Sequence, residues 1–182
     1  MRIRRFCYPI RVLGPGERLG IWVTGCSFHC PGCMSPELQD PAAGRELPCE
    51  ELIAAAKKAP GPIDGVTISG GEPFDQPQQL HLLVEALCRQ ITTDIIIYSG
   101  YTLAQLRARK CPDTDAVLDS ISVLIDGRYM EELDDGIGLR GSSNQHLHIF
   151  QNPQRYAYMA DCKREIQIFN YNHAASLMVG LL

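Results

Sequence analysis

The stretch Ile21-Trp22-Val23-Thr24-Gly25-Cys26-Ser27-Phe28-His29-Cys30-Pro31-Gly32-Cys33 decides how this chain is interpreted. A short apolar run is followed at once by three cysteines with the spacing C-x3-C-x2-C. The run predicts a buried strand, and the glycine and proline after it predict a loop. The loop gathers three thiolates and supplies no fourth. Iron–sulfur cubanes are usually held by four thiolates, so a cubane held by three keeps one iron open to a small molecule.

The same cysteines admit a second interpretation, a zinc knuckle completed by His29 or Cys49. Zinc ribbons normally use C-x2-C pairs at both ends of a longer loop, and a second pair is missing here. Pro31 and Gly32 interrupt any helix through the third cysteine, so we expect a turn that folds the thiolates toward one point. The spacing therefore favours an iron–sulfur cluster. The remaining cysteines are scattered and are interpreted as structural: Cys7, Cys49, Cys88, Cys111 and Cys162.

Composition limits the classes of function. The chain has 182 residues, 45% of them hydrophobic, and a net charge of −4, which is ordinary for a globular protein. We expect one domain over residues 1–182. The weak net charge gives no argument for a nucleic acid or an anionic membrane as a partner. The basic N-terminus lacks the apolar core of a signal peptide, and no apolar stretch approaches the ~20 residues that span a bilayer. The expected location is the cytoplasm.

Short β-branched runs alternate with helical patterns along the chain. The clearest helix, Pro77–Gln90, repeats apolar residues at i, i+3, i+4, i+7 and i+8. This alternation predicts an α/β fold with a mostly parallel sheet, either a partial (β/α) barrel or an open sheet. The expected strands are Ile21–Thr24, Gly65–Ser69, Asp94–Tyr98, Ser122–Asp126 and His146–Phe150, with a weaker one at Glu165–Phe169. The other expected helices are Cys49–Ala59 and Thr102–Lys110.

Ligands of such folds gather at the carboxyl ends of the strands. Three loops follow strands there: Gly25–Cys33, Gly70–Asp75 and Ser99–Tyr101. In the second of these, two glycines let the backbone approach a ligand and offer N–H groups to an anion, and the carboxylate of Glu72 can receive an ammonium. The sequence thus predicts a pocket for an amino acid with both of its charged ends.

The cysteine spacing together with Gly70-Gly71-Glu72-Pro73 resembles the signature of the radical S-adenosylmethionine superfamily. Within it, the chain resembles the small activating enzymes of glycyl-radical proteins, above all those of the anaerobic ribonucleoside-triphosphate reductase. The motifs that carry this likeness run from about Tyr8 to His148. They are Gly14-Pro15-Gly16-Glu17-Arg18, Cys33-Met34-Ser35-Pro36-Glu37, Ser99-Gly100-Tyr101-Thr102, Ile125-Asp126-Gly127-Arg128-Tyr129 and Arg140-Gly141-Ser142-Ser143-Asn144-Gln145.

The chain departs from the pattern in a few places. Gly32 stands where many superfamily members have an aromatic residue, Ser35 replaces a frequent asparagine, and Gln39 replaces a common tryptophan. The motif-bearing part covers about residues 8–150, so residues 151–182 form a divergent C-terminal extension.

The resemblance implies a mechanism. Cys26, Cys30 and Cys33 bind three irons of a [4Fe–4S] cluster, and the fourth iron takes the amino and carboxylate groups of S-adenosylmethionine. The methionine end is lined by Gly70, Gly71 and Glu72, and the backbone around Gly32, Cys33 and Met34 lies near the adenine. One electron cleaves the sulfonium, and the resulting 5′-deoxyadenosyl radical takes a hydrogen atom from a glycine of the partner. The implied partners are a large glycyl-radical reductase subunit and a flavodoxin or ferredoxin as electron donor.

Two alternatives stay open at this point. One keeps the cofactor but acts on a small molecule or a peptide, and the other is a non-enzymatic zinc-binding interaction module. The resemblance also favours partner or substrate contact for Arg140–Gln145, although a turn rich in side-chain caps explains the same residues. Asp126 either touches the ribose or caps a turn. His146 and His148 fit an exposed strand edge better than a metal site, and Tyr98 and Tyr101 flank a strand end as packing residues.

Overall fold

The computed structural model describes residues 1–171 and 175–181. Within these residues, a seven-stranded sheet has the order β3-β1-β2-β4-β5-β6-β7. Four central strands run parallel: β2 (Arg18–Val23), β4 (Gly65–Gly70), β5 (Ile95–Ser99) and β6 (Val123–Asp126). Antiparallel strands flank them: β1 (Arg2–Ile10), β3 (Arg45–Glu46) and β7 (His146–Ile149). The predicted α/β class with a mostly parallel sheet is confirmed.

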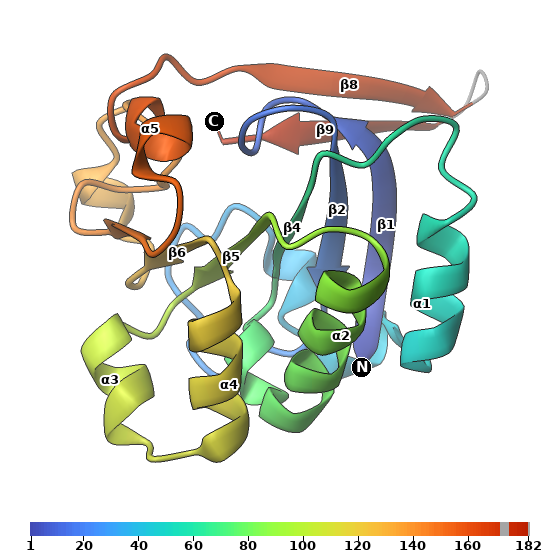
Figure 1. Ribbon diagram of the computed structural model, residues 1–182. Helices are drawn as coiled ribbons and strands as arrows, with labels where there is room; N and C mark the ends of the chain where they lie inside the picture. The colour runs from blue at the N-terminus through green and yellow to red at the C-terminus, as the bar shows by residue number, and fades with distance from the viewer. Residues whose placement is uncertain (172–174, 182) are drawn as a thin grey trace.

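Helices cover one face of this sheet (Figure 1). They are α1 (Cys49–Ala56), α2 (Pro77–Gln90), α3 (Leu103–Ala108) and α4 (Pro112–Ser120). Successive strand residues point to opposite faces, so the apolar face takes every second residue of each strand. Leu19, Ile21 and Val23 of β2 point to this face. They belong to one apolar cluster with Ile68 of β4 and with apolar residues of β5. Leu80, Leu83 and Leu87 of α2 complete this cluster from the helical layer.

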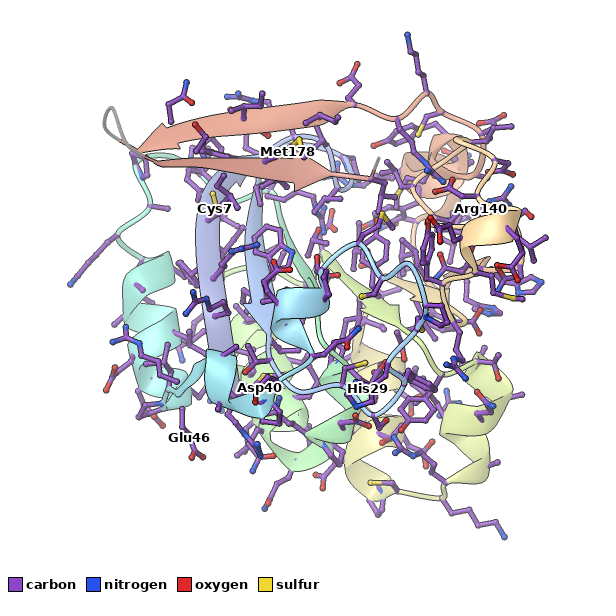
Figure 2. All side chains as sticks on the ribbon, turned by 180° about the vertical axis from the view of Figure 1, so that it is seen from behind. Cys7, His29, Asp40, Glu46, Arg140 and Met178 are labelled. Atoms are coloured by element: carbon purple, nitrogen blue, oxygen red, sulfur yellow. The ribbon has the colours of Figure 1, made fainter. Side chains whose placement is uncertain are left out.

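The opposite face of the parallel strands is more polar. In one row across the sheet, Arg5 of β1 pairs with Trp22 of β2, and Trp22 pairs with Ser69 of β4. None of the helices α1 to α4 covers this face (Figure 1). Instead, the loop that carries the cysteines and His29 lies on this side of the sheet (Figure 2).

Arg18, the last residue of the Gly-Pro-Gly-Glu-Arg motif, gives this motif a structural role. Its side chain is fully buried, donates from Nε to Thr67 Oγ1 at 2.7 Å and lies 2.9 Å from Asp94 Oδ1. A Cβ at Gly65 would overlap the guanidinium. A buried charge needs such partners, and here they fasten the start of β2 to β4 and β5.

The C-terminal extension returns over the polar face. Tyr156, the last residue of a short helix, α5 (Pro153–Tyr156), and Met159 beyond it pack on β5 and β6. The chain then forms a separate antiparallel hairpin, β8 (Ile166–Tyr171) and β9 (Ala175–Gly180), which crosses above β1 and β2 (Figure 1). Val179, Leu177 and Phe169 on its inner face belong to one apolar cluster with Trp22 of β2.

The sequence predictions match the six expected strands to within a few residues, and helix α2 as predicted. The helix expected over Cys49–Ala59 ends at Ala56, the one expected over Thr102–Lys110 spans α3, and β7 runs antiparallel. The strands β1, β3 and β9 and the helices α4 and α5 were not predicted. In the described part of the chain, α2 is the longest helix at 14 residues, and no helix has the length and apolar character needed to cross a bilayer.

Candidate cofactor site

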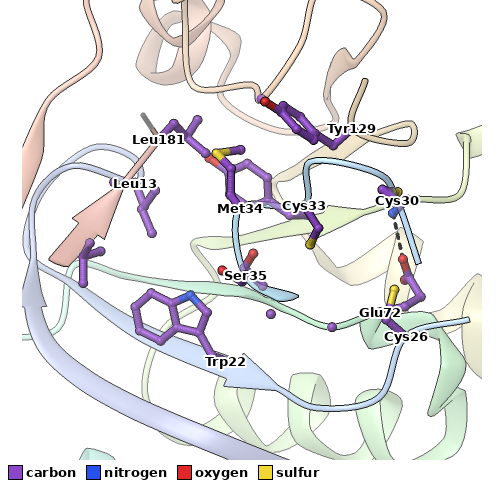
Figure 3. Close-up of a pocket in the computed structure, with 18 of the residues that line it drawn as sticks. Leu13, Trp22, Cys26, Cys30, Cys33, Met34, Ser35, Glu72, Tyr129 and Leu181 are labelled. Carbon is purple, nitrogen blue, oxygen red and sulfur yellow. Dashed lines mark hydrogen bonds between the residues drawn. The ribbon is translucent and has the colours of Figure 1, made fainter. Parts of the chain in front are cut away.

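A cavity of about 410 Å³ lies at the carboxyl ends of the parallel strands. This volume falls in the range of about 300–1,000 Å³ of small-molecule sites. The three cysteines of the loop after β2 line it, together with the backbone after β4 and β5 (Figure 3). Of the residues predicted from sequence, those that line it are Cys26, Cys30, Cys33, Met34, Gly70, Gly71 and Glu72. Gly32, which was also predicted, is not among the lining residues. The structure therefore brings the two predicted loops together in one pocket.

The cysteine loop is held at its base by backbone hydrogen bonds. Gly25 donates to the carbonyl of Leu38 at 2.9 Å, and Cys26 donates to that of Gln39 at 3.1 Å. His29 and Gly32 take positive φ angles of 47° and 66°, which let the loop turn twice within a few residues. The sharp turns that Pro31 and Gly32 predicted are thus present, and they direct three thiols into the pocket.

The three thiols do not form a group that could hold a single metal ion. Among the described residues, no three His, Cys, Asp or Glu side chains form such a group. A zinc ion draws its ligand atoms to about 2.0–2.3 Å from one centre. The cysteines of a cubane instead bind different irons and surround a larger body.

Neither proposed fourth ligand of a zinc knuckle lines this pocket. His29 Nδ1 lies 3.1 Å from Gln39 Oε1 on the outside of the loop. Cys49 is at the start of α1, where its thiol lies 3.6 Å from the carbonyl of Leu82. The three thiols thus stand without a fourth in the pocket wall that the structure describes.

The thiol of Cys26 is half-buried. Burial raises its pKa, and the nearby carboxylates of Glu72 and Asp75 raise it further. Hydrogen bonds from the backbone of the loop lower the pKa and offset part of this rise. These surroundings therefore disfavour the thiolate. A bound cluster supplies the positive charge that deprotonates such a ligand.

Gly70 and Gly71 join the two loops. Gly71 N–H donates to the carbonyl of Val23 at 2.9 Å, and Glu72 N–H donates to that of Gly25 at 2.8 Å. A Cβ at Gly71 would overlap the Gly25 oxygen, and one at Gly70 would overlap the backbone of Val23. The expectation that the Gly71 N–H faces an anion is wrong, because this N–H bonds to the end of β2. Glycine is required here for close approach of two backbones.

The carboxylate of Glu72 is 1% exposed and accepts three internal hydrogen bonds. The donors are Phe74 N–H at 2.9 Å, the Ser99 hydroxyl at 3.0 Å and Gly100 N–H at 2.7 Å. Burial raises its pKa to about 7 although these bonds favour the charged form. The side chain links the end of β4 to the end of β5 beside Cys26 and Cys30 (Figure 3).

A second group of side chains holds the loop between the first two cysteines, and sequence reasoning missed most of it. Asp75 Oδ2 accepts Ser27 N–H at 2.9 Å, and its Oδ1 accepts the Tyr101 hydroxyl at 2.8 Å. The rings of Phe28 and Tyr101 meet edge to face at 4.5 Å. Arg128 Nη2 donates to the Phe28 carbonyl at 2.9 Å. Only Tyr101 stood out in the sequence, by its place after a strand.

The segment Arg140–Gln145 forms a turn that is bonded within itself. Gln145 Oε1 accepts Gly141 N–H at 2.6 Å, and its Nε2 donates to the Gly127 carbonyl at 2.6 Å. Gly141 and Gln145 also line the pocket. The side chains of this turn thus cap its own backbone, as one of the two sequence interpretations predicted. The turn also forms part of the pocket wall.

Asp126 lies outside the pocket lining. Its Oδ2 accepts Leu103 N–H at the start of α3 and lies 2.9 Å from His148 Nε2. His146 and His148 share one face of β7, the edge strand of the sheet. Asp126 therefore caps a neighbouring helix. Tyr98 does line the pocket, and its hydroxyl donates to the Leu139 carbonyl at 3.0 Å.

Comparisons with known proteins agree with this geometry. Residues 12–148 match the family described as 4Fe-4S single cluster domain. The anaerobic ribonucleoside-triphosphate reductase-activating protein of Vibrio cholerae is 35% identical over 152 residues, which are 79% of this chain and 95% of that protein. The proteins of the same name from Salmonella typhimurium and Escherichia coli K12 are 33% and 31% identical and cover 81% and 78% of this chain, and 98% and 94% of their own lengths.

The predicted iron–sulfur family is confirmed, and the zinc-binding module finds no support in these likenesses. The family match ends at residue 148, so it does not include the C-terminal hairpin. Because the match runs through both motif loops and relatives above 30% identity cover about four-fifths of the chain, the chain belongs to the family of anaerobic ribonucleoside-triphosphate reductase-activating proteins.

Proposed function

We propose that the chain activates the large subunit of an anaerobic ribonucleoside-triphosphate reductase by installing a glycyl radical on it. The observation that carries this proposal is the convergence of three thiols, without a fourth, on a pocket at the ends of β2, β4 and β5. Such a donor set leaves one iron of a cubane for a small molecule. The names of the relatives supply the reaction partner.

In this function, Cys26, Cys30 and Cys33 hold a [4Fe–4S] cluster that binds S-adenosylmethionine. When the cofactor is bound, one electron and the nucleotide convert a glycine Cα–H of the partner into a radical, with methionine and 5′-deoxyadenosine as the other products. The electron comes from a low-potential protein such as a flavodoxin or ferredoxin. The protein's contribution is placement, because the cofactor carries the difficult chemistry.

The residues around the cluster have separate tasks in this proposal. Gly70 and Gly71 bring the backbone of β4 against the cysteine loop, and both line the pocket where the methionine end of the nucleotide would bind. Glu72 holds the β4 and β5 ends at a fixed distance. The backbone from Gly32 to Met34 lies on the opposite side of the pocket and suits the adenine. Of these residues, Cys33, Met34, Gly70, Gly71 and Glu72 line one cavity.

The architecture supports a partial barrel, the finer of the two folds expected. Helices α1 to α4 pack on one face, and the polar row on the other face borders the pocket. We treat residues 1–182 as one domain of this kind, acting in the cytoplasm.

The test uses protein reconstituted with iron and sulfide under argon. Reduced protein, S-adenosylmethionine and the reductase subunit are expected to give 5′-deoxyadenosine and a glycyl doublet by electron paramagnetic resonance. Alanine at all three cysteines of the loop abolishes both, whereas Cys88→Ala, on the buried side of α2, keeps both. Nucleotide cleavage without a doublet would support a small-molecule or peptide substrate instead. One zinc per chain with no sulfide would establish the binding module.

A further inference from the structure

The part of the pocket wall near the third cysteine is backed by the long connection between β6 and β7, residues 127–145. An added Cβ at Gly32 would overlap the Glu131 carboxylate of this connection. An added Cβ at Gly141 would lie 2.9 Å from Met34 Cε, so the connection also touches the side chain of Met34. The 127–145 connection therefore supports, at two points, the segment that the proposed function gives to the adenine.

The 127–145 connection has little regular structure of its own. In this fully described stretch, the only helical piece is the short turn Glu131–Leu133, and Gly138 takes a positive φ of 68°. A connection of this length needs contacts outside itself to hold one conformation. The C-terminal extension provides them. Gly138 N–H donates to the Cys162 carbonyl at 2.8 Å, and Leu139 N–H donates to the Met159 carbonyl at 2.7 Å.

Arg164 of the extension adds a charged clamp to these backbone bonds. Its side chain is 6% exposed, and Nη1 lies 2.7 Å from Asp134 Oδ1. Its Nε donates to the Gly138 carbonyl at 3.3 Å, and Nη2 donates to the Gly141 carbonyl at 3.2 Å. A guanidinium can make these bonds together because its donors form a rigid planar fork. The family match ends at residue 148, so this clamp lies beyond it.

Asp134 extends the clamp to the pocket. Its Oδ2 accepts the Tyr129 hydroxyl at 3.2 Å, and Tyr129 lines the pocket. Figure 3 shows the ring of Tyr129 above Met34. An added Cβ at Gly141 would lie 2.9 Å from this ring, as it would from Met34. Arg164 therefore holds two residues of the wall beside Met34, Gly141 by its carbonyl and Tyr129 through Asp134.

We propose that Arg164 is a positioning residue for the nucleotide, holding the wall of Tyr129 and Gly141 against the Met34 segment that receives the adenine. The inference rests on the proposed function and deepens it, because it makes the C-terminal extension part of the cofactor site. Arg164 does not itself line the pocket, so it acts through the 127–145 connection. The backbone bonds at the base of the cysteine loop involve other residues, so the cluster should assemble without Arg164.

Calorimetric titration of protein reconstituted under argon tests this role. Arg164→Met is expected to bind S-adenosylmethionine about tenfold more weakly while it keeps its full content of iron and sulfide. Because the wall concerned lies beside the adenine segment, binding of 5′-deoxyadenosine should weaken by the same factor, and binding of methionine alone should stay unchanged. Equal weakening for both fragments would show a general loss of pocket structure and overturn the proposal, as would no weakening for either.

Arg155→Met is the matched control. Arg155 belongs to the same extension and also pairs with an aspartate, Asp94 at 2.8 Å, but neither residue lines the pocket. This variant is expected to bind S-adenosylmethionine as the unaltered chain does. A loss of affinity as large as that of Arg164→Met would contradict a specific role for Arg164.

Arg164→Lys keeps the proposal testable if Arg164→Met does not fold. The lysine keeps a positive charge beside Asp134 but lacks the planar fork that reaches the Gly138 and Gly141 carbonyls. We expect it to fold, to hold the cluster and to bind S-adenosylmethionine weakly. An unchanged affinity would reduce Arg164 to one half of an ion pair and overturn the proposal. Loss of iron together with affinity would show that the extension supports the cluster and would overturn it as well.

The unaltered chain separates this inference from the function on which it rests. If the reconstituted chain binds no S-adenosylmethionine, both proposals fail. If it binds the nucleotide and forms the glycyl doublet, while Arg164→Met binds equally well, the positioning role alone fails. Binding that depends on Arg164, without a glycyl doublet on the reductase subunit, supports the positioning role and overturns the proposed function.

Discussion

The carboxylate of Glu72 accepts the backbone N–H of Gly100 at 2.7 Å, and this bond joins the ends of two neighbouring parallel strands. The Ser99 hydroxyl and Phe74 N–H complete the set of donors. The side chain is buried, so the link is shielded from water. The position of the cysteine loop over β4 and β5 depends on it, because Glu72 N–H also bonds to Gly25.

Glu72 makes stability depend on pH. Its pKa is raised from 4.5 to about 7 in the folded protein by burial, so the folded state binds a proton more tightly than the unfolded state. The contribution is fully present below about pH 4.5 and is lost as the pH rises through about 7. We expect the free energy of unfolding of the apoprotein, measured with urea under argon, to fall by roughly 3 kcal/mol over this interval.

Glu72→Gln removes this titration and flattens the pH profile. Glu85→Gln, on the exposed face of α2, is the matched control and keeps the original slope. Parallel profiles for the original chain and Glu72→Gln would show that Glu72 stays ionised in the folded protein.

Gly71→Ala is expected to prevent cluster assembly. Its Cβ would overlap the carbonyl oxygen of Gly25, so the cysteine loop has to move away from β4. Iron and sulfide content after anaerobic reconstitution measures the effect, and we expect a drop of most of the bound iron. Gly136→Ala is the control, because a Cβ there meets nothing within 4 Å and its positive φ of 69° costs only about 1 kcal/mol. Full iron content in Gly71→Ala would contradict the close approach.

Tyr101→Phe should loosen the cysteine loop. The change removes hydrogen bonds to Asp75 at 2.8 Å and to the Ser27 hydroxyl at 3.1 Å. Hydrogen bonds to charged groups contribute about 1.5–3 kcal/mol, so we expect a loss of about 2 kcal/mol in urea denaturation. Tyr158→Phe is the control, since this ring is 45% exposed and its hydroxyl has no partner in the described part of the chain. Equal losses for both variants would count against the network.

Arg18→Met tests the buried end of β2. Removing one partner of a buried ion pair costs about 3–5 kcal/mol, because Asp94 and the Thr67 hydroxyl lose their donor. Arg155 still contacts Asp94 at 2.8 Å, which places the expected loss near about 3 kcal/mol. Arg89→Met removes an exposed pair of 3.5 Å and should cost less than about 0.5 kcal/mol. Thermal unfolding of the two variants measures the difference.

Sequence reasoning succeeded where the signal is local. The cysteine spacing, the β-branched runs before each motif loop and the apolar stripe of α2 each lie within one short segment. The placement of the two motif loops in one pocket followed from the rule that parallel strands end at one edge. These features do not depend on knowing what packs against them.

The features that were missed depend on partners distant in sequence. β1 begins Arg2-Ile3-Arg4-Arg5, which has the charge of a basic tail, and it is a strand because Ile3 packs into the core beside β2. The Gly71 N–H and the Glu72 carboxylate looked free in sequence, and only the approach of the end of β2 and of β5 shows that they are occupied. The contact of Asp75 with Tyr101 joins loops 26 residues apart.

The distribution of helices has a consequence for redesign. Since α1 to α4 seal one side of the sheet, the largest apolar cluster lies there, while the hairpin β8–β9 packs on the side that bears Trp22. The hairpin can therefore be exchanged without rebuilding the main core. Reshaping the pocket wall demands new terminal residues more than a new scaffold.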